Sequence, residues 1–173
     1  MERLFGLPDR LQLVQPAQQA EIDRIRRSMK RGRDHDVTLF ITKDDGFIFI
    51  AKPFYPPGLF RAPSGGVHPD EHFIDGAKRE AREETGVEIE LEHFLLHIGV
   101  CFQSEIDKVN WTSYIFKARY LSGEIDPQDK YEISAARLVH PDEIPKFREL
   151  MLQSSNAGLR YRAYLTDETL QRI

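Results

Sequence analysis

The clearest pattern along the chain is a series of apolar, β-branched and aromatic runs that predict strands. Residues 37–43 and 47–52 read VTLFITK and FIFIAK, and a short turn of sequence DDG separates them. Two such runs joined by an Asp-Gly turn predict a β-hairpin. Two longer runs, 87–100 and 109–120, are joined by the polar segment 103–108 and predict a pair of long strands. A shorter candidate strand covers residues 133–139.

Apolar residues at helical spacing predict an amphipathic helix near the N-terminus. Ile22, Ile25 and Met29 recur three and four positions apart after the break at Pro16, so the helix is expected over residues 17–30. Further helices are predicted around the stripe of Ile74, Ala77 and Ala81, from Pro141 to about Gln153, and as a short final helix capped by Thr166, Asp167 and Glu168.

The order of these elements indicates the fold class. Strands lie on both sides of one central helix, and a further helix follows them. This order favours an α/β protein of the α+β type, with a mixed sheet between helices, over a doubly wound parallel sheet.

Composition fits a single compact domain. The chain has 173 residues, one cysteine and a formal net charge of −4. A domain of this size buries roughly 70% of its unfolded surface and needs no disulfide. No apolar run approaches the roughly 20 residues of a membrane helix, and the start of the chain lacks a signal-peptide pattern. Cytoplasmic residence without a membrane partner is therefore expected, and the net charge argues against an extended nucleic-acid footprint.

One segment concentrates charge in a way that predicts chemistry. Residues 65–87 read GGVHPDEHFIDGAKREAREETGV, in which Glu80, Glu83 and Glu84 stand at i, i+3 and i+4. On a helix these three carboxylates share one face within about 5–6 Å at their Cβ atoms. The neighbouring Arg79 cannot neutralise them all. Oxygen ligands favour Mg²⁺ or Mn²⁺, which indicates a phosphate-handling metal site.

A segment such as KREAREET taken alone is most often a solvated helix face, but its flanks argue otherwise. Gly65 and Gly66 precede the helix where backbone must approach something closely, and Gly86 stands where a helix C-cap favours a left-handed residue. Gly76 in mid-helix costs about 1 kcal/mol relative to alanine, and its presence indicates close packing, in our interpretation against the sheet.

The order Gly65, Glu71 and Arg79 followed by EAREETGV resembles, position for position, the signature box of the Nudix hydrolases. The resemblance implies the Nudix fold, an α/β/α sandwich with a mixed sheet, over roughly residues 36–150. We accordingly predict an N-terminal helical extension (1–33), a Nudix hydrolase domain (34–155) and a C-terminal extension (156–173).

The resemblance implies metal-dependent hydrolysis of a diphosphate linkage in a nucleoside diphosphate derivative. Glu80 and Glu84 are the expected metal ligands, aided by the carbonyl of Gly65 or Ser64. Glu83 is expected to bind metal through water or to act as the general base. Arg79 is expected to orient Glu83 or Glu71 by a charge-assisted hydrogen bond, which places these residues in the catalytic group.

Candidate residues also lie outside the box. Glu132 follows a polar loop and precedes the last predicted strand, where many family members place a catalytic or metal-binding glutamate; Asp126 and Asp129 are weaker candidates. Near the glycines, the predicted substrate-binding residues are Arg61, Phe60 and Tyr55. Phe54 and Trp111 are further candidates for stacking on a nucleobase, although aromatic residues beside strands more often belong to the core.

The particular substrate stays open at this stage. The residues that mark ADP-ribose, dinucleoside polyphosphate, NADH and coenzyme A hydrolases of the family are absent. A basic helix face motivates an RNA 5′-end pyrophosphohydrolase as an alternative; it consists of Arg24, Arg27, Lys30 and Arg31, with Arg33 just beyond. An isomerase of the isopentenyl diphosphate type and a catalytically silent Nudix-like binding module are further alternatives. The apolar stripe of the same helix predicts packing at a homodimer interface or over the mouth of the active site.

Overall fold

A computed structural model describes residues 1–29 and 33–173, and its centre is a mixed β-sheet. The sheet has seven strands, six of them in the order β1-β5-β6-β2-β3-β7, while β4 pairs with β2 alone. The pairs β1/β5 and β2/β6 are parallel and the other pairs are antiparallel. The strands are β1 (Asp9–Pro16), β2 (His35–Lys43), β3 (Gly46–Ala51), β4 (Ser64–Gly65), β5 (Glu88–Gln103), β6 (Lys108–Ser122) and β7 (Ala135–Val139).

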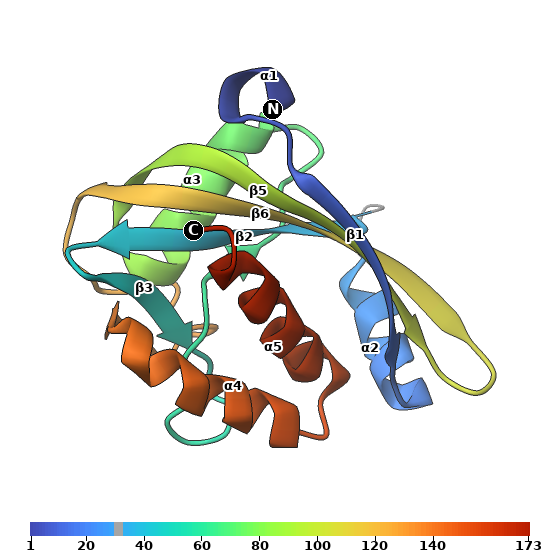
Figure 1. Ribbon diagram of the computed structural model, residues 1–173. Coiled ribbons are helices and arrows are strands. Elements are labelled where there is room, and N and C mark those ends of the chain that lie inside the picture. The colour runs from blue at the N-terminus through green and yellow to red at the C-terminus, as the bar shows by residue number, and fades with distance from the viewer. Residues whose placement is uncertain (30–32) are drawn as a thin grey trace.

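Helices cover both faces of this sheet, which makes the fold the predicted α/β/α sandwich. Figure 1 shows α4 and α5 over one face and α3 over the other. The helices are α1 (Glu2–Phe5), α2 (Gln19–Ser28), α3 (Phe73–Thr85), the 3₁₀ turn η2 (Pro141–Glu143), α4 (Ile144–Gln153) and α5 (Ala157–Leu170). The predicted α+β class with a mixed sheet is confirmed.

Alternation along the strands builds one hydrophobic core on each face. In β2, Leu39 packs toward α3 with Ala77 and Ala81, whereas the next residue, Phe40, packs toward α4 and α5 with Phe147. All five of these side chains are fully buried or nearly so. A strand buried on both faces shows no regular alternation of apolar and polar residues, which explains why residues 37–41 of β2 are all apolar except Thr38.

Irregularities in β5 change which face its side chains reach. The pairing of β5 with β6 shifts register between Leu91 and His93 and again between Phe94 and Leu96. Phe94 therefore lies in the α3-side core, stacked on Phe116 at 4.6 Å, while Leu96 lies in the core on the α4 and α5 side. A β-bulge inserts one extra residue and so reverses the direction of the side chains beyond it.

The predicted hairpin and long strands are confirmed. Thr42 pairs with Phe47 and Lys43 with Gly46 across the DDG turn. The paired strands β5 and β6 extend a few residues beyond the predicted runs because they form one long antiparallel ribbon. The predicted N-terminal helix is confirmed as α2; its expected last residue, Lys30, lies outside the described residues.

Two predictions at the ends of the chain were wrong. The segment 166–168 does not cap a short final helix but lies inside α5, whose N-cap is Asn156: its Oδ1 accepts from the backbone N–H of Gly158 at 2.8 Å and of Leu159 at 3.2 Å. The residues before α2 are not only helical, because β1 adds a parallel edge strand beside β5. Leu11 and Leu13 of β1 pack against the core. Two alternating apolar residues are too few to predict a strand from the sequence.

Candidate active site

The glutamate-rich helix α3 is positioned by glycines at both ends. Gly86 ends it in a left-handed conformation with φ of 82°, and its N–H donates to the carbonyl of Arg82 at 2.8 Å. At the other end, the carboxylate of Glu80 lies so close to Gly65 that a Cβ there would stand 1.8 Å from a carboxylate oxygen. The two predictions about glycine in this segment are confirmed, since backbone does approach a side chain at Gly65 and the C-cap is left-handed.

Gly76 has a different neighbour from the one predicted. A Cβ at this position would lie 2.7 Å from Oε1 of Glu71 and 2.9 Å from Cγ1 of Val67. The close packing is therefore against the loop before α3, not against the sheet. The absence of a side chain lets Glu71 fold back over the first turn of α3, where the N–H of His68 donates to it at 2.7 Å.

Arg79 connects the carboxylates to the glycine loop. Its guanidinium donates to both carboxylate oxygens of Glu71, at 2.7 and 3.1 Å, and to the carbonyl of Gly66 at 2.9 Å. The same side chain donates to Glu80 and to Glu83, each at 2.9 Å. Arg79 thus contacts both of its expected partners at once, and the bidentate pair with Glu71 fixes the orientation of its planar group.

Of the box glutamates on α3, Glu84 is buried and Glu80 is mostly buried, with a side chain 14% exposed. Burial raises the pKa of Glu80 to about 7, and the opposing effect of Arg79 does not cancel it. Burial also raises the pKa of Glu84, although the positive charges of Arg61 and Lys52 act against it. Glu84 accepts from the Ser64 N–H at 2.6 Å and lies 3.5 Å from Nζ of Lys52. By contrast, the Glu83 side chain is 43% exposed.

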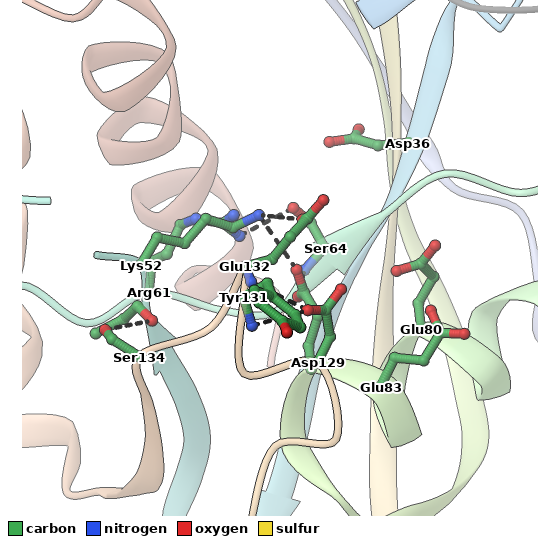
Figure 2. Close-up of polar contacts among 12 residues, drawn as sticks. Asp36, Lys52, Arg61, Ser64, Glu80, Glu83, Asp129, Tyr131, Glu132 and Ser134 are labelled. Atoms are coloured by element: carbon green, nitrogen blue, oxygen red, sulfur yellow. Dashed lines mark hydrogen bonds and ion pairs between the residues drawn. The ribbon is translucent and has the colours of Figure 1, made fainter. Parts of the chain in front are cut away.

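The loop before β7 brings Glu132 to these residues. The carbonyl of Glu83 accepts from the backbone N–H groups of Gln128 and Asp129, at 2.9 and 3.0 Å, which ties the loop to the end of α3. A carboxylate oxygen of Glu132 lies 3.1 Å from Nζ of Lys52. Figure 2 shows this contact as a dashed line. Asp129 accepts from the Glu132 N–H at 3.1 Å, so it shapes the loop. Asp126 pairs instead with Lys130 at 2.9 Å and is exposed.

A cavity of about 350 Å³ joins these groups into one site. Its lining includes residues from the glycine loop, α3, the loop before β7 and the strands: Gly65, Arg79, Glu80, Glu83, Glu84 and Glu132, with Lys52, Arg61 and Asp36. All the predicted metal ligands therefore share one cavity. Glu71 stands behind it and reaches it through Arg79.

Residues that the sequence analysis missed form the opposite wall. Arg162 of α5 donates to Asp36 at 2.5 Å and to Thr38 at 2.7 Å, and the Ser113 hydroxyl donates to Asp36 at 2.6 Å. Asp36 is buried. The sequence does offer a signal for Asp36. It is a carboxylate at the start of a strand predicted to be buried, and a buried charge needs a partner nearby. No sequence signal pointed to Arg162 or Lys52.

A second cavity, of about 270 Å³, adjoins the first and is mostly apolar. It is lined by aromatic and aliphatic side chains including Ile25, Phe54, Tyr55, Phe102, Trp111 and Leu159. Both cavities share the lining residues Ser28, Asp36, Lys52, Arg61, Trp111 and Arg162. The shared wall thus carries three cationic side chains between an apolar and a carboxylate-rich space.

The predicted substrate-binding residues divide between this cavity and the core. Arg61 and Tyr55 line the cavity, and Nε of Arg61 donates to the Tyr55 hydroxyl at 2.5 Å. Phe60 lies elsewhere: its ring is 5.8 Å from that of Phe147 and 4.5 Å from the guanidinium of Arg137. Adjacent residues in extended backbone point to opposite sides, so Phe60 and Arg61 cannot both face the cavity.

Helix α2 packs over the mouth of the site. Ile22 is fully buried in the core, and Arg24, Ile25 and Ser28 line the apolar cavity. Glu21 fastens α2 to α5 by accepting from the Ala157 N–H at 2.6 Å. The apolar stripe therefore packs beside the active-site cavities, in line with one of its two predicted roles, and the homodimer interface stays a prediction.

The basic face of α2 has mixed surroundings. Arg24 lines the cavity, whereas Arg26 pairs with Asp107 at 2.8 Å. Arg33 lies beside Gly66 and lines the carboxylate cavity. Lys30 and Arg31 lie outside the described residues. Of the basic residues predicted on this face, Arg24 and Arg33 therefore lie at the two cavities.

The donor set fits a hard divalent cation. Glu80, Glu83 and Glu84 supply only oxygen atoms, and the missing side chain of Gly65 lets the Glu80 carboxylate lie close to the backbone of β4. Within residues 1–29 and 33–173, no three His, Cys, Asp or Glu side chains are gathered closely enough to hold a metal as they stand. Arg79 holds Glu80 and Glu83, while Ser64 and Lys52 hold Glu84, so these contacts compete with a metal for the carboxylates.

Comparison with known proteins identifies the family. The family model for the NUDIX domain matches residues 32–158, and the chain belongs to this family. The resemblance found in the signature box is thereby confirmed. Within the described residues, no helix is long and apolar enough to cross a membrane.

Similar curated proteins are NAD-capped RNA hydrolases. The chain is 32% identical over 107 residues to the NAD-capped RNA hydrolase NudC of Stutzerimonas stutzeri. The aligned region covers 62% of this chain and 36% of that protein. NudC of Pseudomonas aeruginosa is 31% identical over 113 residues, with the same coverage of 62% and 36%. The chain thus spans little more than a third of the length of the curated relatives that it matches.

Solved structures share the fold. A NUDIX hydrolase from Nitrosomonas europaea aligns with a TM-score of 0.54 at 18% identity, over 79% of this chain and 90% of that one. A MutT protein from Bacillus halodurans aligns with a TM-score of 0.53 at 24% identity, over 65% of this chain and 72% of that one. These likenesses support the α/β/α architecture.

Proposed function

We propose that this protein is a metal-dependent pyrophosphohydrolase that cleaves the diphosphate of a nucleoside diphosphate derivative. The observation that carries the proposal is the arrangement of two joined cavities, one rich in carboxylates and one apolar, with Lys52, Arg61 and Arg162 in the wall they share. A substrate with an apolar group attached to a diphosphate fits these two adjoining cavities. The nucleoside occupies the apolar cavity, and the phosphates lie between the cations and the carboxylates.

Glu80 and Glu84 hold the divalent cation, Mg²⁺ or Mn²⁺, with a backbone carbonyl of Gly65 or Ser64. When bound, the cation neutralises phosphate charge and lowers the pKa of an attacking water. Glu84 is suited to this role because Ser64 fixes one of its oxygens at 2.6 Å from a backbone N–H. The raised pKa values of both carboxylates mean that a cation relieves an electrostatic cost of the metal-free fold.

Glu83 removes the proton from the attacking water or binds metal through water. Its side chain is the most exposed of the three box glutamates on α3, so water reaches it. Arg79 is a positioning residue: it contacts Glu83 and Glu80 at 2.9 Å and is itself fixed by the bidentate pair with Glu71. A charge-assisted hydrogen bond of this kind keeps the reactive oxygen in place.

Lys52 and Glu132 act at the phosphate side of the site. Lys52 lies between Glu84 and Glu132, at 3.5 and 3.1 Å, at the end of β3. A flexible ammonium group can leave a carboxylate for a phosphate oxygen. Glu132, with a side chain 66% exposed, then becomes free to bind a second cation or to orient water.

A substrate panel tests the proposal. Purified protein is assayed with Mg²⁺ or Mn²⁺ against ADP-ribose, NAD⁺, nucleotide sugars, dinucleoside polyphosphates and nucleoside triphosphates, with release of nucleoside monophosphate or phosphate as the readout. We expect cleavage of at least one compound, and a loss of about 10² to 10⁴-fold in kcat for Glu83→Gln. Full activity in excess chelator, or unchanged kcat in Glu83→Gln, Glu80→Gln and Glu84→Gln alike, refutes the mechanism.

Hydrolysis at the 5′ end of RNA is a second candidate. Its support is the likeness to proteins named NAD-capped RNA hydrolases, together with Arg24 and Arg33 at the two cavities. The same capped nucleotide presented free and on a short RNA separates the candidates. A kcat/KM at least tenfold higher for the capped RNA favours the RNA substrate, whereas equal values favour the small molecule.

A further inference from the structure

Arg33 differs from most cationic side chains of the carboxylate cavity because it forms no ion pair. Arg79, Lys52 and Arg162 each pair with a carboxylate. In the part of the chain that the structure describes, the Arg33 guanidinium donates to a neutral group, the carbonyl of Ser28, at 3.4 Å. The sequence between positions 29 and 33 is KRG, which contains no carboxylate. The positive charge of Arg33 is therefore available to an anionic ligand of this cavity.

The missing side chain of Gly66 makes room for Arg33. A Cβ at Gly66 would lie 2.0 Å from Nη1 of Arg33 and 2.6 Å from its Cζ. The preceding residue, Gly65, makes room for the carboxylate of Glu80 in the same way. Two adjacent glycines thus let a carboxylate of α3 and a guanidinium from the segment after α2 approach the same loop. A cation bound by Glu80 and an anion bound by Arg33 would be neighbours.

Trp111 supports the Arg33 guanidinium. Cζ of Arg33 lies 6.0 Å from the centroid of the indole ring, which is a cation–π contact. The side chain of Arg33 is partly exposed and lines the carboxylate cavity. Trp111 lines both the carboxylate cavity and the apolar cavity. Arg33 therefore lies beside the junction of the two cavities, where a group attached to an apolar moiety would enter the carboxylate-rich space.

We propose that Arg33, held on Trp111 in the space left by Gly66, binds the substrate phosphate that is nearest the nucleoside. A guanidinium presents its N–H groups in a planar fork that matches the oxygen atoms of a phosphate. This inference rests on the proposed function in placing the nucleoside in the apolar cavity and the diphosphate beside the carboxylates. Because Arg33 has no ion pair to break, its contact with phosphate costs less than the same contact made by Lys52.

The substitution Arg33→Gln tests the proposal, because it removes the charge and the fork and keeps a polar side chain. Arg27→Gln is the matched control, since Arg27 is an exposed residue of α2 that lines neither cavity. Calorimetry in millimolar Mg²⁺ measures the affinity for AMP and for α,β-methylene-ADP, whose bridge resists hydrolysis. We expect Arg33→Gln to raise both dissociation constants by about 5- to 50-fold. Arg27→Gln should change them by less than about twofold.

Two further measurements separate a phosphate contact from a structural role. Adenosine has no phosphate, so Arg33→Gln should bind it as wild type does. The melting temperature of the ligand-free protein should fall by less than about 4 °C, because the substitution breaks a cation–π contact and no ion pair. A larger fall, together with an equal loss of affinity for adenosine, would assign Arg33 to the fold and overturn the proposal.

The substitution Gly66→Ala tests the position of Arg33 without changing Arg33 itself. The backbone at Gly66 is outside the left-handed region, so alanine adds no backbone strain. Its methyl group must displace the guanidinium, and AMP binding should weaken about as much as in Arg33→Gln. The double variant should bind AMP no more weakly than Arg33→Gln alone, because one contact can be lost only once. Losses that add in the double variant contradict the proposed place of Arg33 at Gly66.

The outcomes distinguish this inference from the proposed function. If hydrolysis occurs but Arg33→Gln binds AMP as wild type does, or if Arg27→Gln gives the same loss, the role of Arg33 is refuted and the function stands. If no diphosphate is cleaved but Arg33→Gln weakens binding of AMP and not of adenosine, the phosphate contact stands and the hydrolytic proposal fails. A loss confined to α,β-methylene-ADP overturns the assignment to the nearest phosphate. A wild-type protein that binds neither nucleotide overturns the whole inference.

Discussion

Replacing Glu80 by glutamine should stabilise the metal-free protein above neutral pH. Burial raises the pKa of Glu80 to about 7 from its ordinary value of 4.5. The folded state therefore favours the protonated carboxyl, and this preference is complete below pH 4.5, declines between pH 4.5 and 7, and is lost above pH 7. Each tenfold difference in proton affinity between the folded and unfolded states corresponds to about 1.4 kcal/mol. Ionising Glu80 at pH 8 therefore lowers the free energy of unfolding by about 3 kcal/mol, given its pKa of about 7 in the fold and 4.5 outside it.

Glutamine keeps the shape of the side chain and carries no charge at any pH. The melting temperature of Glu80→Gln should exceed that of wild type by roughly 6–12 °C at pH 8, because a domain of this size shifts by about 2–4 °C per kcal/mol. At pH 4 the two proteins should melt within about 2 °C of each other. The hydrogen bond from Arg79 to the charged carboxylate is already part of the pKa of about 7, so the range needs no further reduction for its loss.

Differential scanning fluorimetry in excess chelator from pH 4 to pH 8.5 measures this difference. Glu149→Gln on the exposed face of α4 is the control for removing a carboxylate from a helix. Adding millimolar Mg²⁺ should stabilise wild type more than Glu80→Gln and so narrow the gap at pH 8. A wild type whose melting temperature follows that of Glu80→Gln at every pH, or a variant that melts lower at pH 8, refutes the argument that burial dominates at Glu80.

Four further predictions test other parts of the site. Chelation should abolish hydrolysis, and millimolar Mg²⁺ or Mn²⁺ should raise the wild-type melting temperature; turnover that persists in chelator contradicts this. Glu84→Gln should lose activity that high Mn²⁺ partly restores, whereas Glu83→Gln should not recover, as kcat measured against metal concentration will show. Arg162→Met leaves Asp36 buried without its positively charged partner and should cost about 3–5 kcal/mol in urea unfolding, so a change below about 1 kcal/mol contradicts the pair. Ile22→Ala should cost about 2–5 kcal/mol, and an unaltered unfolding midpoint would show that α2 is only a surface element.

Local patterns predicted the parts of the fold that depend on neighbours in sequence. The hairpin of β2 and β3 follows from a turn between two apolar runs, and the C-cap at Gly86 follows from the freedom of glycine at positive φ. The face that Glu80, Glu83 and Glu84 share follows from helical spacing alone. Their gathering in one cavity with Gly65 also follows the predicted box, because loop and helix are consecutive.

The tertiary structure decided which distant segments complete the site. Arg162 reaches Asp36 across 126 positions of sequence, and Lys52 reaches Glu132 across 80. Hydrophobic periodicity tells which face of an element is buried, but it does not tell which other element covers that face. For the same reason, the place of Leu159 of α5 at the apolar cavity had no signal in the sequence. The sequence by itself determined the loop and helix that carry the carboxylates, whereas the packing of α2 and α5 on the sheet decided the apolar cavity beside them.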